Sequence, residues 1–285
     1  MSEPGGNRVK PLTYGLILVA VLLSAYVVMA QTGFDERSEK KIGDMTACEL
    51  NRDGYIRQPA NGFSNFAIVI TGLLILHRMD TMPRQSSATY AGRLTSPYGE
   101  KTVESWLYGV SVIAVGMGSF FFHGSMTKFG LEFDKIAMAV WILLPITYAF
   151  IRAIGAGRLS HLILWSATSV ASGWAILFVD HFGITDLYFI LIPIWAALEI
   201  IAHLRHKFGF NRYMLLGSAL FLVAYLIRAK GEGDDAICYP ESLLQWHAIW
   251  HILSAVVIWL FWLHMTAVSP TTGGAADSDC AEESE

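Results

Sequence analysis

The sequence predicts an all-α fold, a polytopic bundle of transmembrane helices with a seven-helix core and one further helix at the N-terminus. Of the 285 residues, 54% are hydrophobic and only 15% are charged, which is more apolar surface than a soluble domain of this size needs. Several apolar runs also approach the roughly 20 residues that a helix needs to cross a bilayer. We therefore expect an integral membrane protein, and the net charge of −4 argues against nucleic-acid binding.

The first apolar run covers residues 12–30 and follows a polar start that carries Arg8 and Lys10. It is either a retained helix or a secretory signal peptide, because the small residues Val28 and Ala30 offer a peptidase site. We expect retention, since the run is longer than the ~7–15 apolar residues of a signal peptide. In both cases Arg8 and Lys10 place the N-terminus inside.

Seven more apolar runs predict the helical core, which we assign to residues 62–266 between an outer polar segment (31–61) and an acidic, disordered inner tail (267–285). The glycines at 109, 116 and 118 are expected to let neighbouring helices approach closely. With residues 12–30 the chain has eight predicted helices, or seven if the first is removed. The seven core runs are residues 63–76, 106–122, 133–151, 162–179, 187–202, 213–227 and 243–266.

The distribution of basic residues predicts the orientation of the bundle. Short outer loops hold only Lys128, Lys135, Arg228 and Lys230, whereas short inner loops hold Arg78, Arg84, Arg93, Lys101, Arg152, Arg158, Arg205, Lys207 and Arg212. This topology places Cys48 and Cys238 on the same outer side, where a disulfide can persist, and Cys280 inside. We therefore expect a Cys48–Cys238 disulfide.

The same topology predicts a metal site near the outer face. His247 and His251 are one helical turn apart and share a face of the last helix. His123 ends an outgoing helix at the same depth, and Asp134 lies at the outer end of the next ingoing helix. Ser119 precedes His123 by one turn on the same face. Three imidazoles and one water complete a tetrahedral zinc site of the catalytic kind.

Other polar residues of the helices are interpreted as structural. Histidine, serine and asparagine in membrane bundles commonly hydrogen-bond to neighbouring helices. We read Asn61, Ser64 and Asn65 in this way, and also His77, His161, His181, His203, His206 and His264. Trp246 and Trp250 beside the histidine pair are interpreted as anchors at the membrane interface.

These motifs resemble the alkaline ceramidases, a family in a wider membrane-hydrolase superfamily that includes adiponectin-receptor-like and Per1-like proteins. The resemblance covers roughly residues 46–262. Its most specific parts are the serine and histidine at 119 and 123 with the following aspartate, and the HAxWH motif. In order along the chain it comprises Cys48-Glu49-x-Asn51, Asn61-x-x-Ser64-Asn65, Gly118-Ser119-x-x-x-His123, Asp134 and His247-Ala248-x-Trp250-His251.

The resemblance implies a seven-helix core that holds zinc on His123, His247 and His251, with Ser119 and Asp134 beside the metal. It also implies a calcium site in the segment before the first core helix, for which Glu49 and Asn51 match the family pattern. Three positions of that pattern differ: Thr46 and Ala47 replace an Asp-Trp pair, and Gln58 replaces a glutamate. These changes remove carboxylates that a hard cation prefers.

The activity implied is hydrolysis of the amide of a ceramide-like lipid to a long-chain base and a fatty acid. Asp134 would accept the proton of water and pass it to the leaving amine, and Ser119 would donate to the oxyanion. Two alternatives stay open: hydrolysis of another lipid, such as a phospholipid or acylated-anchor ester, and a receptor or regulator with structural zinc. A signal-like start favours a bacterial inner membrane, with the site towards the periplasm and the C-terminus in the cytoplasm.

Overall fold

The computed structural model describes residues 10–34, 45–82, 96–179, 184–206, 211–230 and 237–267. Two short strands, β1 (Met45–Thr46) and β2 (Glu49–Leu50), form an antiparallel hairpin. The short helices are α2 (Pro59–Ser64) and the 3-10 turns η1 (Met79–Thr81) and η2 (Pro97–Gly99). The long helices are α1 (Pro11–Thr32), α3 (Phe66–Arg78), α4 (Val103–Ser125), α5 (Lys128–Ile154), α6 (Arg158–Phe178), α7 (Ile184–His206), α8 (Arg212–Lys230) and α9 (Trp246–Ala267).

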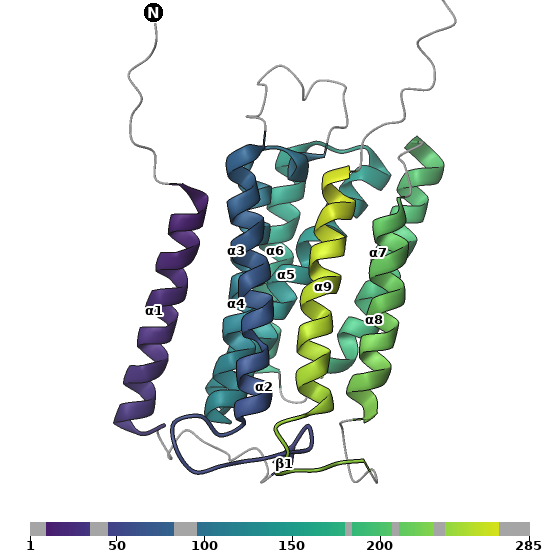
Figure 1. The fold of residues 1–285 in the computed structure, drawn as a ribbon. Helices are drawn as coiled ribbons and strands as arrows, with labels where there is room; N and C mark the ends of the chain where they lie inside the picture. Colours follow the sequence, from purple (N-terminus) through teal and green to yellow (C-terminus); the bar gives the residue numbers. More distant parts are fainter. Residues whose placement is uncertain are drawn as a thin grey trace, which may run out of the picture.

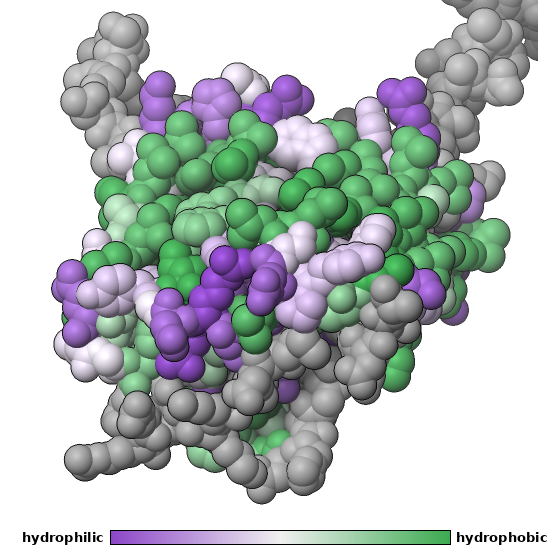
Figure 2. Space-filling view, turned by 60° about the horizontal axis from the view of Figure 1, so that its bottom comes forward, coloured by the Kyte–Doolittle hydropathy of each residue, from purple (hydrophilic) through white to green (hydrophobic). Residues whose placement is uncertain are grey.

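The predicted all-α membrane bundle is confirmed. Each of the eight predicted apolar runs forms a helix, and the helices stand side by side along one direction (Figure 1). In the described part of the chain, seven spans are long and apolar enough to cross a membrane, with α2 and α3 counted as one. Hydrophobic residues form a belt between two more hydrophilic ends (Figure 2). The segment 268–285, predicted to be an acidic tail, lies outside the described residues.

Two predicted helix starts near the histidines are wrong. Helix α5 begins at Lys128, because the Thr127 side chain accepts a hydrogen bond from the Gly130 amide at 3.0 Å. Asp134 therefore lies in the second turn of α5. Helix α9 begins later than predicted, because the Gln245 side-chain amide donates to the Tyr239 carbonyl at 3.0 Å and holds a loop up to residue 245. His247 therefore lies in the first turn of α9.

Small residues of α4 allow the close helix packing that was predicted. A Cβ atom on Gly116 would lie 2.8 Å from the Val69 amide nitrogen of α3. On Gly118 it would lie 3.0 Å from the Asp134 Cα of α5. Real Cβ atoms rarely approach so closely, so glycine is required at both positions for α4 to sit between α3 and α5. The second contact brings Asp134 next to Ser119.

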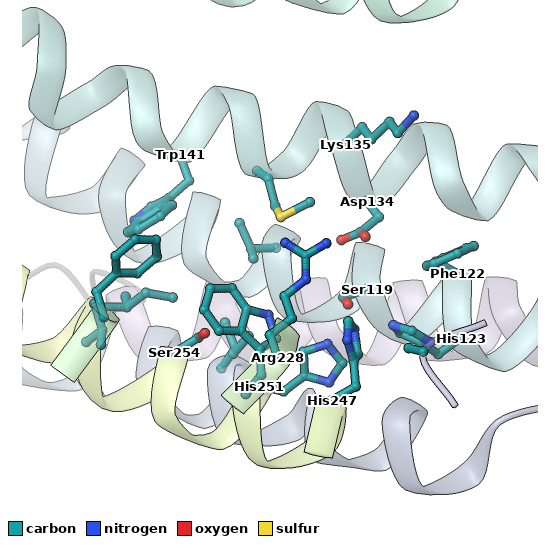
Figure 3. Close-up of a pocket in the computed structure, with 18 of the residues that line it drawn as sticks. Ser119, Phe122, His123, Asp134, Lys135, Trp141, Arg228, His247, His251 and Ser254 are labelled. Carbon is teal, nitrogen blue, oxygen red and sulfur yellow. The ribbon is translucent and has the colours of Figure 1, made fainter. Parts of the chain in front are cut away.

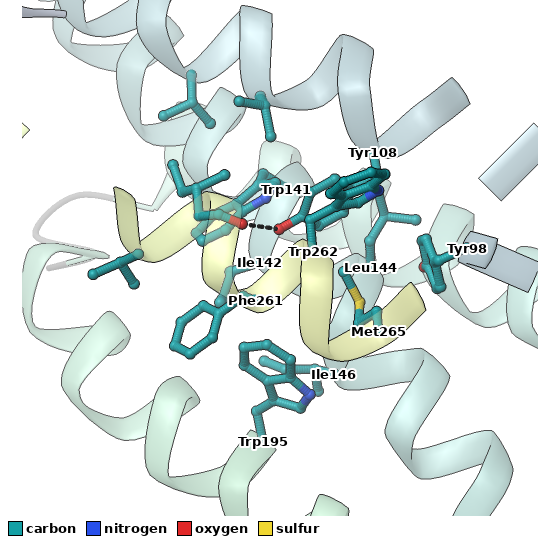
Figure 4. Close-up of a cluster of buried hydrophobic side chains, with 14 of the residues drawn as sticks. Tyr98, Tyr108, Trp141, Ile142, Leu144, Ile146, Trp195, Phe261, Trp262 and Met265 are labelled. Carbon is teal, nitrogen blue, oxygen red and sulfur yellow. Dashed lines mark hydrogen bonds between the residues drawn. The ribbon is translucent and has the colours of Figure 1, made fainter. Parts of the chain in front are cut away.

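The largest apolar core lies between α4, α5, α7 and α9 (Figure 4). Trp195 of α7 packs edge-on against Phe261 of α9, with ring centroids 4.6 Å apart. The Tyr108 hydroxyl of α4 donates to the Ile258 carbonyl of α9 at 3.1 Å, which satisfies a polar group inside the apolar cluster (Figure 4).

Helix α1 packs on the outer side of α3 and α4. A Cβ on Gly15 would lie 2.6 Å from a Leu76 methyl group, so this glycine permits close contact with α3. Near the other end of α1, the Tyr26 hydroxyl donates to the Tyr55 carbonyl at 2.6 Å, and the Tyr26 ring packs against Phe120 and Phe121. Helix α1 is therefore packed in the described bundle, while its retention in the mature protein stays a prediction.

One end of the bundle, here called the histidine end, holds the β1–β2 hairpin, α2 and the start of α9 (Figure 1). The predicted disulfide between Cys48 and Cys238 is confirmed at this end. The Leu50 amide also donates to the Pro240 carbonyl at 3.0 Å. The hairpin is thereby tied to the segment that leads into α9. Cys280 lies outside the described residues.

Most of the predicted loop cations in the described part of the chain belong to helices, and three of them have notable surroundings. Arg152 lies in the last turn of α5, is 3% exposed, and forms an ion pair with Glu199 of α7. Arg158 begins α6 and pairs with Glu104 of α4. Arg228 belongs to α8 and lines a cavity. A prediction from hydropathy ends the helix at the first charged residue. The helix itself can continue past that residue when the charge is paired or lies in a polar environment. Arg84, Arg93 and Lys207 lie outside the described residues.

Candidate metal centre and cavity

Three histidines meet at the histidine end of the bundle, as predicted. His123 comes from the last turn of α4, and His247 and His251 come from the first two turns of α9. All three are buried, and one ligand nitrogen from each ring lies within 4.8 Å of the others. Figure 3 shows the rings at one side of a cavity. Two helices far apart in sequence thus supply three neutral nitrogen ligands.

The hydrogen bonds behind two of these rings fix which nitrogen faces the centre. His123 Nδ1 lies 2.7 Å from Gln58 Oε1, and an amide oxygen can only accept. His251 Nδ1 lies 2.8 Å from Ser64 Oγ, whose own proton goes to the Asn61 carbonyl at 2.9 Å. Both Nδ1 atoms therefore carry the proton, and both Nε2 lone pairs remain available to a metal.

Backbone contacts hold α2 and the residues before it against α4. The Gln58 amide donates to the His123 carbonyl at 3.0 Å, and the Arg57 amide donates to the Gly124 carbonyl at 2.8 Å. These bonds satisfy carbonyls at the end of α4 that have no partner within the helix. They also place the Gln58 side chain beside the His123 ring.

The buried polar atoms without a hydrogen-bond partner among the described residues include two beside the histidine cluster, His247 Nδ1 and Asp134 Oδ1. Buried polar atoms are nearly always paired, so these atoms indicate a missing partner such as an ion, water or ligand. Three neutral imidazoles are the donor set of a divalent transition metal. The residues present therefore fit a metal ion.

Asp134 and Ser119 lie together beside the histidines, as predicted. Both are buried, at 7% and 6% exposure, and both line the cavity with His123 and His247. Figure 3 shows the Ser119 oxygen between the Asp134 carboxylate and the His247 ring. A proton acceptor and a hydroxyl donor are thus positioned next to the three imidazoles.

The cavity has a volume of about 430 Å³ and extends from this polar group into an apolar interior. Trp250, which was interpreted as an interface anchor, also lines it. Its polar residues gather around the histidines, whereas most of the remaining wall is apolar, including Ile68, Val115, Met138, Trp141, Ile192, Phe221 and Phe261. A cavity with one polar end suits a ligand with an apolar chain and one reactive polar group.

Sequence reasoning missed Arg228 and Lys135 as cavity residues. Arg228 was read as a loop charge because it follows the apolar run by one residue. Helical spacing carried a signal, since Arg228 and Phe221 are seven residues apart and both line the cavity. Ser64 bonds to a neighbouring helix as expected, although its partner His251 was not predicted. Gln58 was missed as the partner of His123, because its segment has no helical apolar period.

The predicted calcium ligand Glu49 caps a helix. It is fully buried, and its carboxylate accepts hydrogen bonds from the Ala60 and Asn61 amides at 2.9 and 2.8 Å, at the start of α2. Burial raises the pKa of the Glu49 carboxyl, an effect that these two amides oppose. Asn51 is half-buried directly after β2. Among the described residues no cluster of three or more His, Cys, Asp or Glu forms around Glu49, and calcium binding stays a prediction.

Comparisons with known proteins assign no family. A scan against protein-family models and a search of curated proteins find no match to this chain. The resemblance to the alkaline ceramidases therefore rests on the motifs given above, and the function has to be argued from the site.

Proposed function

We propose that this protein is a zinc-dependent hydrolase that cleaves the amide of a ceramide-like lipid to a long-chain base and a fatty acid. The observation that carries the proposal is the position of the three histidines. Their ligand nitrogens lie within 4.8 Å of one another at the polar end of an otherwise apolar cavity. Such a cavity, inside a bundle of membrane-spanning helices, suits acyl chains that enter from the bilayer.

His123, His247 and His251 would hold the zinc. A zinc ion on three imidazoles supplies Lewis acidity and lowers the pKa of its bound water to about 7. Gln58 and Ser64 orient two of the rings from behind, which is how metal-binding histidines are usually fixed.

Asp134 is the proposed base, and Ser119 beside it gives the two residues a coupled role. A hydroxyl has one proton, so Ser119 donates either to the Asp134 carboxylate or to a developing oxyanion. When Asp134 takes a proton from water, it no longer needs that donor. Ser119 then turns to the oxyanion, and Asp134 returns its proton to the leaving amine.

The ligand count favours an enzyme over a structural metal site. Among the described residues, three side chains form the metal cluster and no fourth His, Cys, Asp or Glu joins it. Structural zinc sites are usually closed by four protein ligands, whereas catalytic sites keep one position open. A phospholipid or acylated-anchor ester remains the alternative substrate, since the same donors would act on an ester carbonyl.

The proposed location is a bacterial inner membrane with the histidine end towards the periplasm. The Cys48–Cys238 disulfide lies at this end, and disulfides persist in oxidising compartments. A membrane-impermeant thiol reagent applied to intact cells after mild reduction tests the orientation. Labelling of both cysteines is expected, and labelling only after cell lysis would contradict it.

The function is tested by giving the purified, zinc-loaded protein ceramides, acyl-phospholipids and lysolipids in parallel, and identifying released lipids by mass spectrometry. We expect a long-chain base and a fatty acid from ceramides. The His247→Ala and His251→Ala variants should lose both zinc and turnover, while His77→Ala, an exposed histidine of α3, should keep both. Full zinc content in the first two variants would refute the metal assignment.

A further inference from the structure

Among the described side chains that line the cavity, cations outnumber carboxylates. Two of these side chains are cationic, Arg228 and Lys135, and one is a carboxylate, Asp134. The histidines are neutral when they bind a metal, and a divalent ion would add further positive charge. Cations at membrane depth are costly, and they usually mark a functional site. The cavity is therefore electrostatically suited to an anion.

Arg228 is held at the polar end of this cavity. Its guanidinium lies 5.7 Å from the centre of the Trp250 ring, and Trp250 in turn packs edge-on against Phe221 of α8. Figure 3 shows the guanidinium directed towards Asp134, with His247 and His251 beside its stem. Stacking on an aromatic ring restricts the guanidinium and orients its N–H donors.

Lys135 adds a second positive charge on the facing helix. It follows Asp134 in α5 and lines the same cavity, whereas Lys128, near the start of α5, forms an i,i+4 ion pair with Glu132. Both cations line the cavity, but Figure 3 shows the Lys135 ammonium directed away from Asp134 and the histidines, so Arg228 is the cation that reaches the polar end.

We propose that Arg228 binds an anionic group that the substrate carries close to its scissile acyl bond. This inference rests on the proposed function and narrows the substrate class to acylated lipids with a phosphate or carboxylate near the acyl linkage, such as a phosphorylated ceramide. Guanidinium groups recognise both anions through paired N–H donors. Neutral ceramide would then be the poorer substrate.

Binding is tested first, without turnover, using two single-chain lipids of equal length that contain no acyl bond. Hexadecyl phosphate and hexadecanol are titrated into the zinc-loaded protein in detergent micelles, and binding is followed by tryptophan fluorescence. We expect about 10- to 100-fold tighter binding of hexadecyl phosphate, the usual gain from a charged hydrogen bond. Inorganic phosphate is titrated separately to distinguish a lipid headgroup from a free anion.

Variants of Arg228 test whether the preference for hexadecyl phosphate over hexadecanol arises in the cavity. Arg228→Gln should lose it while keeping zinc, Arg228→Lys should keep part of it, and the surface variant Lys128→Gln should leave it unchanged. Equal binding of the two lipids to the wild-type protein would overturn the proposal. So would an unchanged preference in Arg228→Gln, or inorganic phosphate binding as tightly as hexadecyl phosphate.

Turnover then separates this proposal from the proposed function. Ceramide and its 1-phosphate with the same acyl chain are compared, and faster release from the phosphate, reversed in Arg228→Gln, is expected. If neither lipid is cleaved but hexadecyl phosphate binds through Arg228, the anion site stands and the proposed function fails. If ceramide is cleaved and the two single-chain lipids bind equally, the hydrolase stands and the anion site is refuted.

Discussion

Both ends of the bundle bury ionisable groups, but they satisfy them differently. At the end opposite the histidines, Glu199 pairs with Arg152 and with His264, whose Nε2 lies 3.3 Å from the carboxylate. The Trp195 indole also donates to Glu199 at 3.1 Å. Glu104 pairs with Arg158 at the same end. These groups satisfy one another across five helices, α4, α5, α6, α7 and α9, so their combined role is structural.

At the histidine end the polar groups are held from behind and face a cavity. Gln58 and Ser64 bind the outer nitrogens of His123 and His251. His247 Nδ1 and Asp134 Oδ1 have no hydrogen-bond partner among the described residues, and both side chains line the cavity. Burial of polar groups alone therefore does not mark a site. A functional site is indicated when buried polar side chains are held in a fixed orientation but are not paired with one another.

The largest expected effect comes from removing the charge of Asp134. Asp134→Asn should lower lipid turnover by about 10²- to 10⁴-fold, the usual contribution of a general base. Zinc content and the thermal unfolding midpoint should stay near the wild-type values, because Asn fills the same volume. Metal analysis and turnover of the same sample check this. Wild-type turnover would assign the base to another group.

The same type of change at the opposite end should affect stability instead. Glu199→Leu leaves the Arg152 charge buried without its carboxylate and should destabilise the protein by about 3–5 kcal/mol. The double variant with Arg152→Met removes both charges and should recover most of that loss. Unfolding in detergent measures both variants, with zinc content as a check on the distant site. If the single variant were as stable as the double, the network would have no structural role.

The helices and the proximity of the three histidines can both be predicted from the apolar runs. Apolar runs must cross the membrane, so alternating direction fixes the depth of His123, His247 and His251. Contacts that depend on non-local partners could not be predicted. Arg152 and Arg228 both follow an apolar run by one residue, and only the fold shows that one meets Glu199 and the other faces the cavity. The role of Gln58 could not be predicted either, because it depends on the packing of α2 and the preceding residues against α4, which brings Gln58 to His123.

The disulfide connects the β1–β2 hairpin to the segment that leads into α9, and its removal should have an intermediate effect on stability. Cys48 and Cys238 are 190 residues apart in sequence, so their link restricts the unfolded chain strongly. Replacing both by serine should lower stability by about 2–4 kcal/mol. The Leu50–Pro240 backbone bond should preserve the local geometry, so zinc content is expected to remain. Loss of zinc without loss of stability would instead make the disulfide a positioning device for α9.

The smallest expected effect comes from a change that disturbs the orientation of the His123 ring without changing any charge at the metal site. Gln58→Leu removes the acceptor of His123 Nδ1 but changes no ligand and no charge, and it should weaken zinc binding by about 10- to 100-fold. Competition with a chelator measures this affinity.

Gln58→Glu keeps an acceptor oxygen and should retain or strengthen zinc binding. Gln245→Leu is the matched control, because Gln245 is also buried at this end but donates only to the Tyr239 and Ser242 carbonyls. If Gln58→Leu and Gln245→Leu weakened zinc equally, general loosening of this end would explain the result. A specific loss in Gln58→Leu would show that ring orientation makes this end reactive while the opposite end stays inert.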